Sequence, residues 1–249
     1  MNPFHMALLL TANVSMLSAG YYYGIKFIRR QHNHLLGIEW LVIGLSGTNV
    51  LFLAATGIVH SSFSYHLMVF FDAFSRSFGM TLVILLGMKA VTHGYRPSWV
   101  VEVGAVVAAV AVGLNRALDV RPVELGWAIF YLLMNLAVAL YMFAVALRLW
   151  RIGERRHAVW VFVATALGAF VAVIYDFFPI PGDDADHTLF YILAMSVWAL
   201  MLVTYYHGYR ALGEYTRSTC RDGAATEAAV SGGGVRGRMS TNHTALGGL

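Results

Sequence analysis

The chain carries very little charge for its length. Charged residues make up 12% of its 249 residues and apolar residues 59%, whereas a water-soluble domain has about 25% charged residues because its surface faces water. This composition excludes an ordinary soluble domain. It also excludes a nucleic-acid-binding protein, since no basic stripe interleaved with aromatic residues is present. We therefore predict that membrane lipids, rather than water, contact most of the surface.

Two further absences exclude whole classes of protein. Cys220 is the one cysteine, so the chain has no internal disulfide and no metal site built on several cysteines. The last long apolar stretch, residues 187–208, contains no lysine. A retinal protein of the rhodopsin type needs a lysine in that helix to bind its pigment.

The first apolar stretch is too long for a signal peptide and lacks a basic leader, so we interpret it as a membrane span.

Long apolar stretches make up most of the chain. A helix needs about 20 apolar residues to cross the hydrocarbon core of a bilayer. Seven stretches are long enough, and they are 6–28, 36–59, 65–88, 98–115, 125–149, 157–178 and 187–208. We predict an all-α membrane protein, a single bundle of seven transmembrane helices over residues 1–212. Glycine, serine and arginine dominate residues 213–249, which we predict to be a disordered cytoplasmic tail.

Basic residues gather in alternate gaps between these stretches. Fourteen of the 17 Lys and Arg residues lie after the first, third and fifth stretches and in the tail. They are Lys26, Arg29, Arg30, Lys89, Arg96, Arg148, Arg151, Arg155, Arg156, Arg210, Arg217, Arg221, Arg236 and Arg238. Basic loops stay on the cytoplasmic side of a membrane. The pattern predicts a multi-pass protein of the cell (inner) membrane with its N-terminus outside and its C-terminus in the cytoplasm.

Two ionisable residues, Asp72 and Arg76, lie inside the third apolar stretch. Placing a charge at the centre of a span costs about 2.5–3.5 kcal/mol on insertion scales, so such residues are functional candidates by default. The two are one helical turn apart on the same face and are expected to pair. Such a pair either locks the helix against its neighbours or holds a carboxylate for catalysis or ion coupling.

Other polar residues in the stretches have simpler interpretations. Glu39 lies near the cytoplasmic end of the second stretch, where its side chain can reach the membrane interface or meet Lys26. Asn13, Asn49 and Asn135 are expected to form hydrogen bonds between helices.

Histidine and aspartate residues gather at the predicted outer ends of the stretches. His60 ends the second stretch, Asp176 ends the sixth, and Asp183 and His187 open the seventh. Short outer loops are expected to bring these ends together. Imidazole and carboxylate groups can bind a divalent metal such as zinc or transfer protons. The candidate metal ligands are His60, Asp183 and His187, and the candidate catalytic residues are Asp72, Arg76 and Asp176. A solvated acidic loop explains the aspartates of the seventh stretch equally well.

Three short patterns resemble the seven-helix membrane hydrolases that include the alkaline ceramidases and the progestin and adipoQ receptors. Thr56-Gly-Ile-Val-His60 resembles the Ser-x-x-x-His element of that family, and Asp72 resembles the aspartate of its third span. Asp183-Asp-Ala-Asp-His187 lies where the family has His-x-x-x-His. Threonine thus replaces serine, and Asp183 replaces a histidine ligand. The resemblance implies a metal-dependent hydrolase that acts on lipids.

Three classes of function fit the sequence. The favoured hypothesis is a membrane-embedded enzyme acting on a lipid or isoprenoid-like substrate at an outward-facing His/Asp site. Such an enzyme either uses a metal or uses a carboxylic acid as proton donor in an aromatic-lined cavity, as membrane terpene cyclases do. The alternatives are a transporter of a small molecule or ion that uses Asp72 and Arg76, and a seven-helix sensor that signals through its tail.

Overall fold

The computed structural model describes residues 3–56, 63–92, 98–119, 121–178, 180–184 and 187–236. Within these ranges the protein is helical and contains no strand, so the predicted all-α fold is confirmed. The elements are α1 (Pro3–Gln31), α2 (His34–Thr56), α3 (Phe63–Phe74), the π-helical segment η1 (Ser75–Val83), α4 (Ile84–Thr92), α5 (Trp99–Leu118), α6 (Leu125–Arg151), α7 (Arg155–Phe177) and α8 (Thr188–Arg236).

Six helical units in the described ranges are long and apolar enough to cross a membrane. They are α2, the continuous unit α3–η1–α4, α5, α6, α7 and the part of α8 that ends at Thr219. These are the helices of a multi-pass membrane protein. The predicted number of seven spans is wrong on this criterion, because α1 does not qualify. Thr11, Asn13, Ser15 and the run Tyr21-Tyr22-Tyr23 make α1 less apolar than the other helices.

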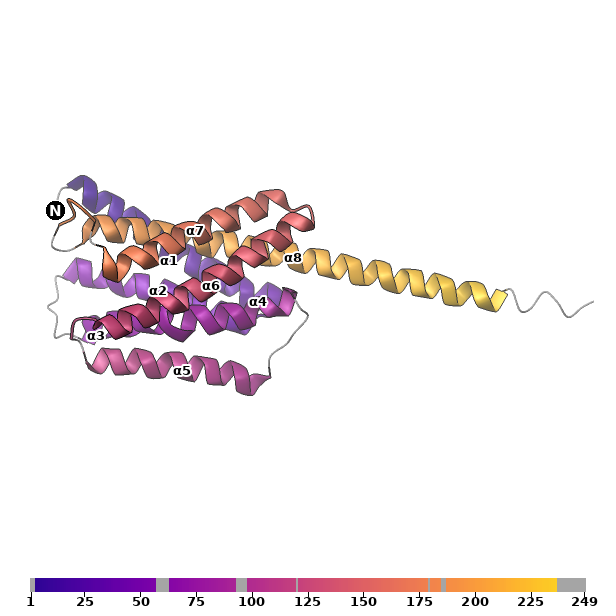
Figure 1. The fold of residues 1–249 in the computed structure, drawn as a ribbon, viewed down its shortest axis with the longest axis horizontal. Coiled ribbons are helices and arrows are strands. Elements are labelled where there is room, and N and C mark those ends of the chain that lie inside the picture. The colour runs from indigo at the N-terminus through magenta and orange to yellow at the C-terminus, as the bar shows by residue number, and fades with distance from the viewer. Residues whose placement is uncertain are drawn as a thin grey trace, which may run out of the picture.

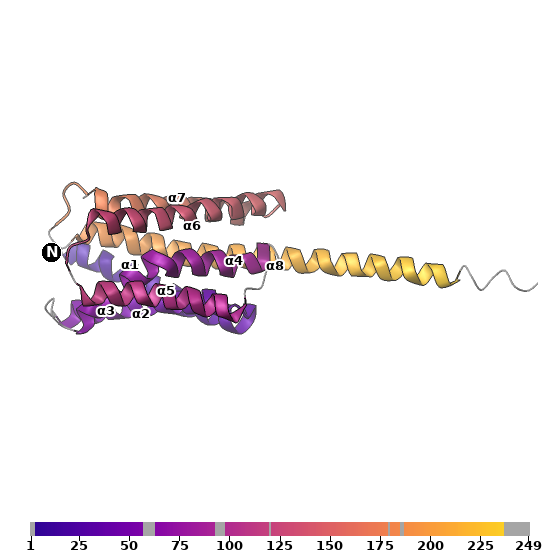
Figure 2. The same cartoon turned by 60° about the horizontal axis from the view of Figure 1, so that its bottom comes forward.

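The helices lie side by side along one common direction (Figures 1 and 2). α1 packs against α2 and α8, α7 packs against α6 and α8, and α5 packs against α3. The N-terminus lies at one end of the bundle, and α8 leaves the bundle at the other (Figure 1). Consecutive helical units alternate in direction, so the basic last turns of α1, α4 and α6 lie at the end where α8 leaves.

Close backbone contact joins α1 to α2. A Cβ atom on Gly20 would lie 2.8 Å from both the Gly44 nitrogen and the Trp40 carbonyl oxygen. No side chain fits there, so the two helices meet through small residues, as is common between membrane helices.

Aromatic packing closes the half of the bundle from which α8 leaves. Trp40 is buried and donates through Nε1 to the Leu202 carbonyl at 3.1 Å, which joins α2 to α8. Its ring packs edge-on against Phe27 of α1 at 5.1 Å. Asn33, just before α2, donates to the Gly87 carbonyl at 2.9 Å and to the Tyr209 hydroxyl at 3.2 Å. These contacts tie α2, α4 and α8 together at that end.

Two of the three predicted interhelical asparagines do join helices. Asn13 of α1 donates to the Met195 sulfur of α8 at 3.5 Å, and Asn49 of α2 donates to the Ser64 carbonyl of α3 at 2.8 Å. Asn135 instead donates to the Tyr131 carbonyl one turn earlier in α6. A polar side chain in a span can form its hydrogen bond within its own helix as well as to another helix.

The last helix extends beyond the predicted membrane domain. We expected the tail to begin at residue 213, but α8 continues as one helix to Arg236. Residues 237–249 lie outside the described ranges. The division into a membrane domain over 1–212 and a tail over 213–249 stays a prediction.

Candidate functional site

A cavity of about 600 Å³ lies between the helices, in the half of the bundle nearer the N-terminus. α1, α2, α3, η1, α6, α7 and α8 all contribute to its wall. Arg121, Pro122 and Val123, which precede α6, also line it, so the cavity reaches the loops at that end. The wall is mostly apolar and is rich in aromatic rings, those of Tyr65, Phe71, Tyr131, Tyr175, Tyr191 and Trp198.

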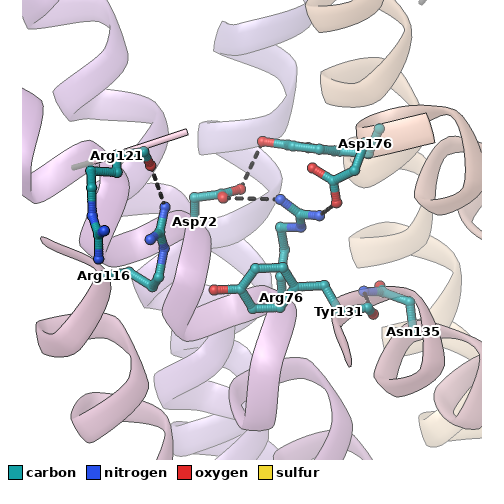
Figure 3. A network of polar contacts seen from close by, with 8 residues as sticks. Asp72, Arg76, Arg116, Arg121, Tyr131, Asn135 and Asp176 are labelled. Atoms are coloured by element: carbon teal, nitrogen blue, oxygen red, sulfur yellow. Dashed lines mark hydrogen bonds and ion pairs between the residues drawn. The ribbon is translucent and has the colours of Figure 1, made fainter. Parts of the chain in front are cut away.

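A network of ionisable side chains forms one part of this wall (Figure 3). Arg76 donates through Nη1 to an Asp72 carboxylate oxygen at 3.3 Å, so the predicted pairing of these residues is confirmed. Its other terminal nitrogen, Nη2, pairs with the Asp176 carboxylate at the end of α7. The Tyr175 hydroxyl donates to the second Asp72 oxygen at 2.8 Å. One guanidinium thus joins the third helical unit to α7.

Two tyrosine rings, one from α6 and one from α7, pack against the guanidinium. The Arg76 Cζ atom lies 3.8 Å from the centroid of the Tyr175 ring and 4.4 Å from that of Tyr131. Arginine stacks well on aromatic faces because its guanidinium is planar and weakly hydrated. Arg76 is therefore fixed by two carboxylates and two rings, whereas the Asp72 side chain keeps 31% of its surface exposed. Of the three charged side chains in the network, Asp72 is the most exposed.

The π-helical segment η1 places Arg76 in this position. Ser77 has φ −88° and ψ −106°, well outside helical values, so the third helical unit is interrupted there. π-Helical turns are rare and are frequent at functional sites. We predicted an unbroken helix over 65–88. The only signal in the sequence is the cluster of small residues Ser75, Ser77 and Gly79, which do not favour a helix interior.

Two arginines for which we predicted no role also line the cavity. Arg116 of α5 is 6% exposed and donates to the Arg121 carbonyl at 2.8 Å. Arg121 forms two hydrogen bonds with Asp119, at 2.7 and 2.6 Å. These bonds lower the pKa of the Asp119 carboxyl below its usual value. Arg121 is thus paired with Asp119, whereas Arg116 brings a positive charge to the cavity wall beside the network of Asp72 (Figure 3).

Of the three predicted metal ligands, the structure describes Asp183 and His187. His60 lies outside the described residues. Asp183 caps α8, because its two oxygens accept from the Leu189 and Phe190 backbone N–H groups at 2.8 and 3.0 Å. His187 is exposed and has a left-handed backbone with φ 53°. The residues that the structure describes contain no group of three His, Cys, Asp or Glu side chains placed to hold a metal. A site that includes His60 stays a prediction.

Thr56, another element of the resemblance, has a local partner. It donates to the Phe52 carbonyl of its own helix at 2.8 Å. The resemblance to the alkaline ceramidases and the progestin and adipoQ receptors stays a prediction. No family model, no curated protein and no solved structure matches this chain.

Proposed function

We propose that the chain is a membrane-embedded enzyme that acts on a lipid or isoprenoid-like substrate in the outward-facing cavity. The observation that carries this proposal is the Asp72 carboxylate, part-exposed at the wall of an aromatic-lined space of about 600 Å³. A cavity of this size is within the range that takes small organic ligands. Its apolar wall suits a hydrocarbon body, and its charged residues suit a polar group.

The chemistry that this arrangement favours is acid–base catalysis. Asp72 has one oxygen toward Arg76 and one toward the Tyr175 hydroxyl. The carboxylate can accept a proton from a bound substrate, and the tyrosine hydroxyl beside it can relay that proton. Aromatic faces stabilise positive charge that develops on a hydrocarbon. Asp72 is therefore the base, and Tyr175 is the group that exchanges a proton with it. Arg76 and Asp176 hold these two side chains in position.

The test compares the purified protein with its Asp72→Asn variant. Each is incubated in detergent with a total membrane lipid extract and with a panel of isoprenoid alcohols, and products are followed by mass spectrometry. We expect the unaltered protein to form a product without any ion gradient. Loss of a general base lowers rates by about 100-fold or more, so Asp72→Asn should reduce product formation by at least that factor. The control is Glu154→Gln, an exposed residue before α7.

Equal product formation by both proteins would contradict the assignment of Asp72. If a lipid or alcohol binds but no product forms, the second candidate function is favoured over the enzyme. That candidate is a transporter of a small amphipathic molecule. It is favoured by the interruption of the third helical unit at η1, because transporter binding sites are typically built on broken helices. Uptake into proteoliposomes that requires a gradient would then replace product formation as the readout.

A further inference from the structure

Glu39 of α2 is buried away from the network of Asp72. Its side chain is 1% exposed, and neither carboxyl oxygen has a hydrogen-bond partner among the described residues. The predicted alternatives for this residue, the membrane interface and Lys26, are both wrong. Lys26 instead donates to the Tyr22 hydroxyl at 2.6 Å. The reason is the orientation of α2, which turns Glu39 toward η1.

The space in front of Glu39 is created by Gly79 of η1. A Cβ atom on Gly79 would lie 3.0 Å from Glu39 Oε2 and 2.7 Å from the Phe74 carbonyl oxygen. Two oxygen acceptors therefore border the same small space, which the glycine leaves open. Acceptors alone cannot satisfy each other, because a hydrogen bond needs a proton donor.

Among the described residues, Glu39 forms no ion pair with any side chain, whichever helix carries it. Neither of its oxygens has a hydrogen-bond donor there. Arg76, the next residue after Ser75, is turned to Asp72 and Asp176. A lone carboxylate in such surroundings is very costly, so the group is held in its neutral form.

We propose that Glu39 is a proton-binding site of this protein, separate from the network of Asp72. The proton lies on the carboxyl group and faces the Phe74 carbonyl across the space beside Gly79. The site lies against η1, the same segment whose Ser75 and Arg76 line the cavity. Loss of the proton would leave an unpaired charge against this segment. The inference does not depend on whether the cavity serves catalysis or transport.

The experiment uses the full-length protein in lipid nanodiscs and infrared spectroscopy between pH 5 and pH 9. A protonated carboxyl group in a dry site has a C=O stretch well separated from that of a carboxylate. We expect the unaltered protein to show this band at neutral pH, and Glu39→Gln to lack it. The control Glu154→Gln changes an exposed glutamate and should keep the band. A spectrum of Glu39→Gln identical to that of the unaltered protein would overturn the proposal.

Thermal unfolding supplies a second readout. Stability should fall as the pH rises, since deprotonation leaves an unpaired charge in the folded state only. Glu39→Gln keeps a neutral group and should remove this part of the pH dependence. Glu39→Met, which lacks polar atoms, should do the same if the amide prevents folding. An unchanged pH profile in the variant that folds would contradict proton binding. Stabilisation by sodium ions at fixed pH, lost in the variant, would identify a cation site instead and would also overturn the proposal.

Discussion

At the scale of residues, the network of Asp72 shows which part of a site a sequence can reveal. The pairing of Asp72 with Arg76 followed from their spacing of one helical turn. Asp176 was a candidate because it ends an apolar stretch, but its ion pair with Arg76 depends on how α7 packs. Tyr175 was not predicted at all, since tyrosine at the end of a span is common. The burial of Glu39 was not predicted for a related reason, because it depends on the rotation of α2 against η1.

The second carboxylate makes Arg76 the critical residue of this network. Arg76→Gln leaves two carboxylates close together without a cation, and removing one partner from a buried pair costs about 3–5 kcal/mol. Asp72→Asn leaves Arg76 paired with Asp176, so it should cost clearly less. The free energies of unfolding of both variants in one detergent test this order. Arg210→Gln is the matched control, because Arg210 pairs with Glu214 at an exposed site where a salt bridge contributes about 0–1 kcal/mol. Equal losses for Arg76→Gln and Asp72→Asn would mean that Asp176 contributes nothing.

At the scale of elements, η1 is the feature that hydrophobic patterning could not predict. The stretch 65–88 is predominantly apolar. A continuous helix and one with a π-helical turn give the same hydrophobic pattern. What distinguishes them is the position of single residues such as Gly79, whose lack of a side chain admits both Glu39 and the Phe74 carbonyl. The helix bounds, in contrast, were largely predictable from the lengths of the apolar stretches.

Gly79→Ala should therefore destabilise the protein. The added methyl group would meet the Phe74 carbonyl oxygen at 2.7 Å, and a backbone atom cannot move away cheaply. The control is Gly104→Ala in α5, where nothing lies within 4 Å of the new Cβ atom. Alanine is favoured over glycine in a helix by about 1 kcal/mol, so Gly104→Ala should be neutral or stabilising. The measurement compares the unfolding temperatures of the two variants with that of the unaltered protein. An equal fall in both variants would show that Gly79 has no special role.

At the scale of the whole molecule, charge and shape are arranged along the same axis. The basic last turns of α1, α4 and α6 lie at the end where α8 leaves (Figure 1). The cavity reaches the loop before α6 at the other end. The sequence predicted this separation of basic and non-basic ends from alternate gaps alone. It also predicted α1 as a helix of the bundle, which its packing against α2 and α8 bears out. The error lay in counting α1 as a span, since its composition is too polar to qualify.

The basic end should face the cytoplasm, because basic loops are retained there. Reporter fusions after Leu212 should give a cytoplasmic signal, and fusions in the loop near Asp119 should give an external one. These two fusions report on α6, α7 and α8. An external signal from a reporter at the N-terminus would show that α1 also crosses the membrane. A cytoplasmic signal at both positions would contradict the predicted topology, and the reverse pattern would turn the cavity to the other side of the membrane.

The polar character of α1 has a consequence for the assembly of the protein. A helix with Thr11, Asn13 and Ser15 partitions into lipid less readily than the six apolar units do. Asn13 finds its partner in α8, 182 residues later in the chain, so α8 leaves the ribosome after α1. During synthesis the side chain of Asn13 therefore has no partner until α8 has been made. We expect the cell to hold α1 at the insertion machinery until α8 arrives.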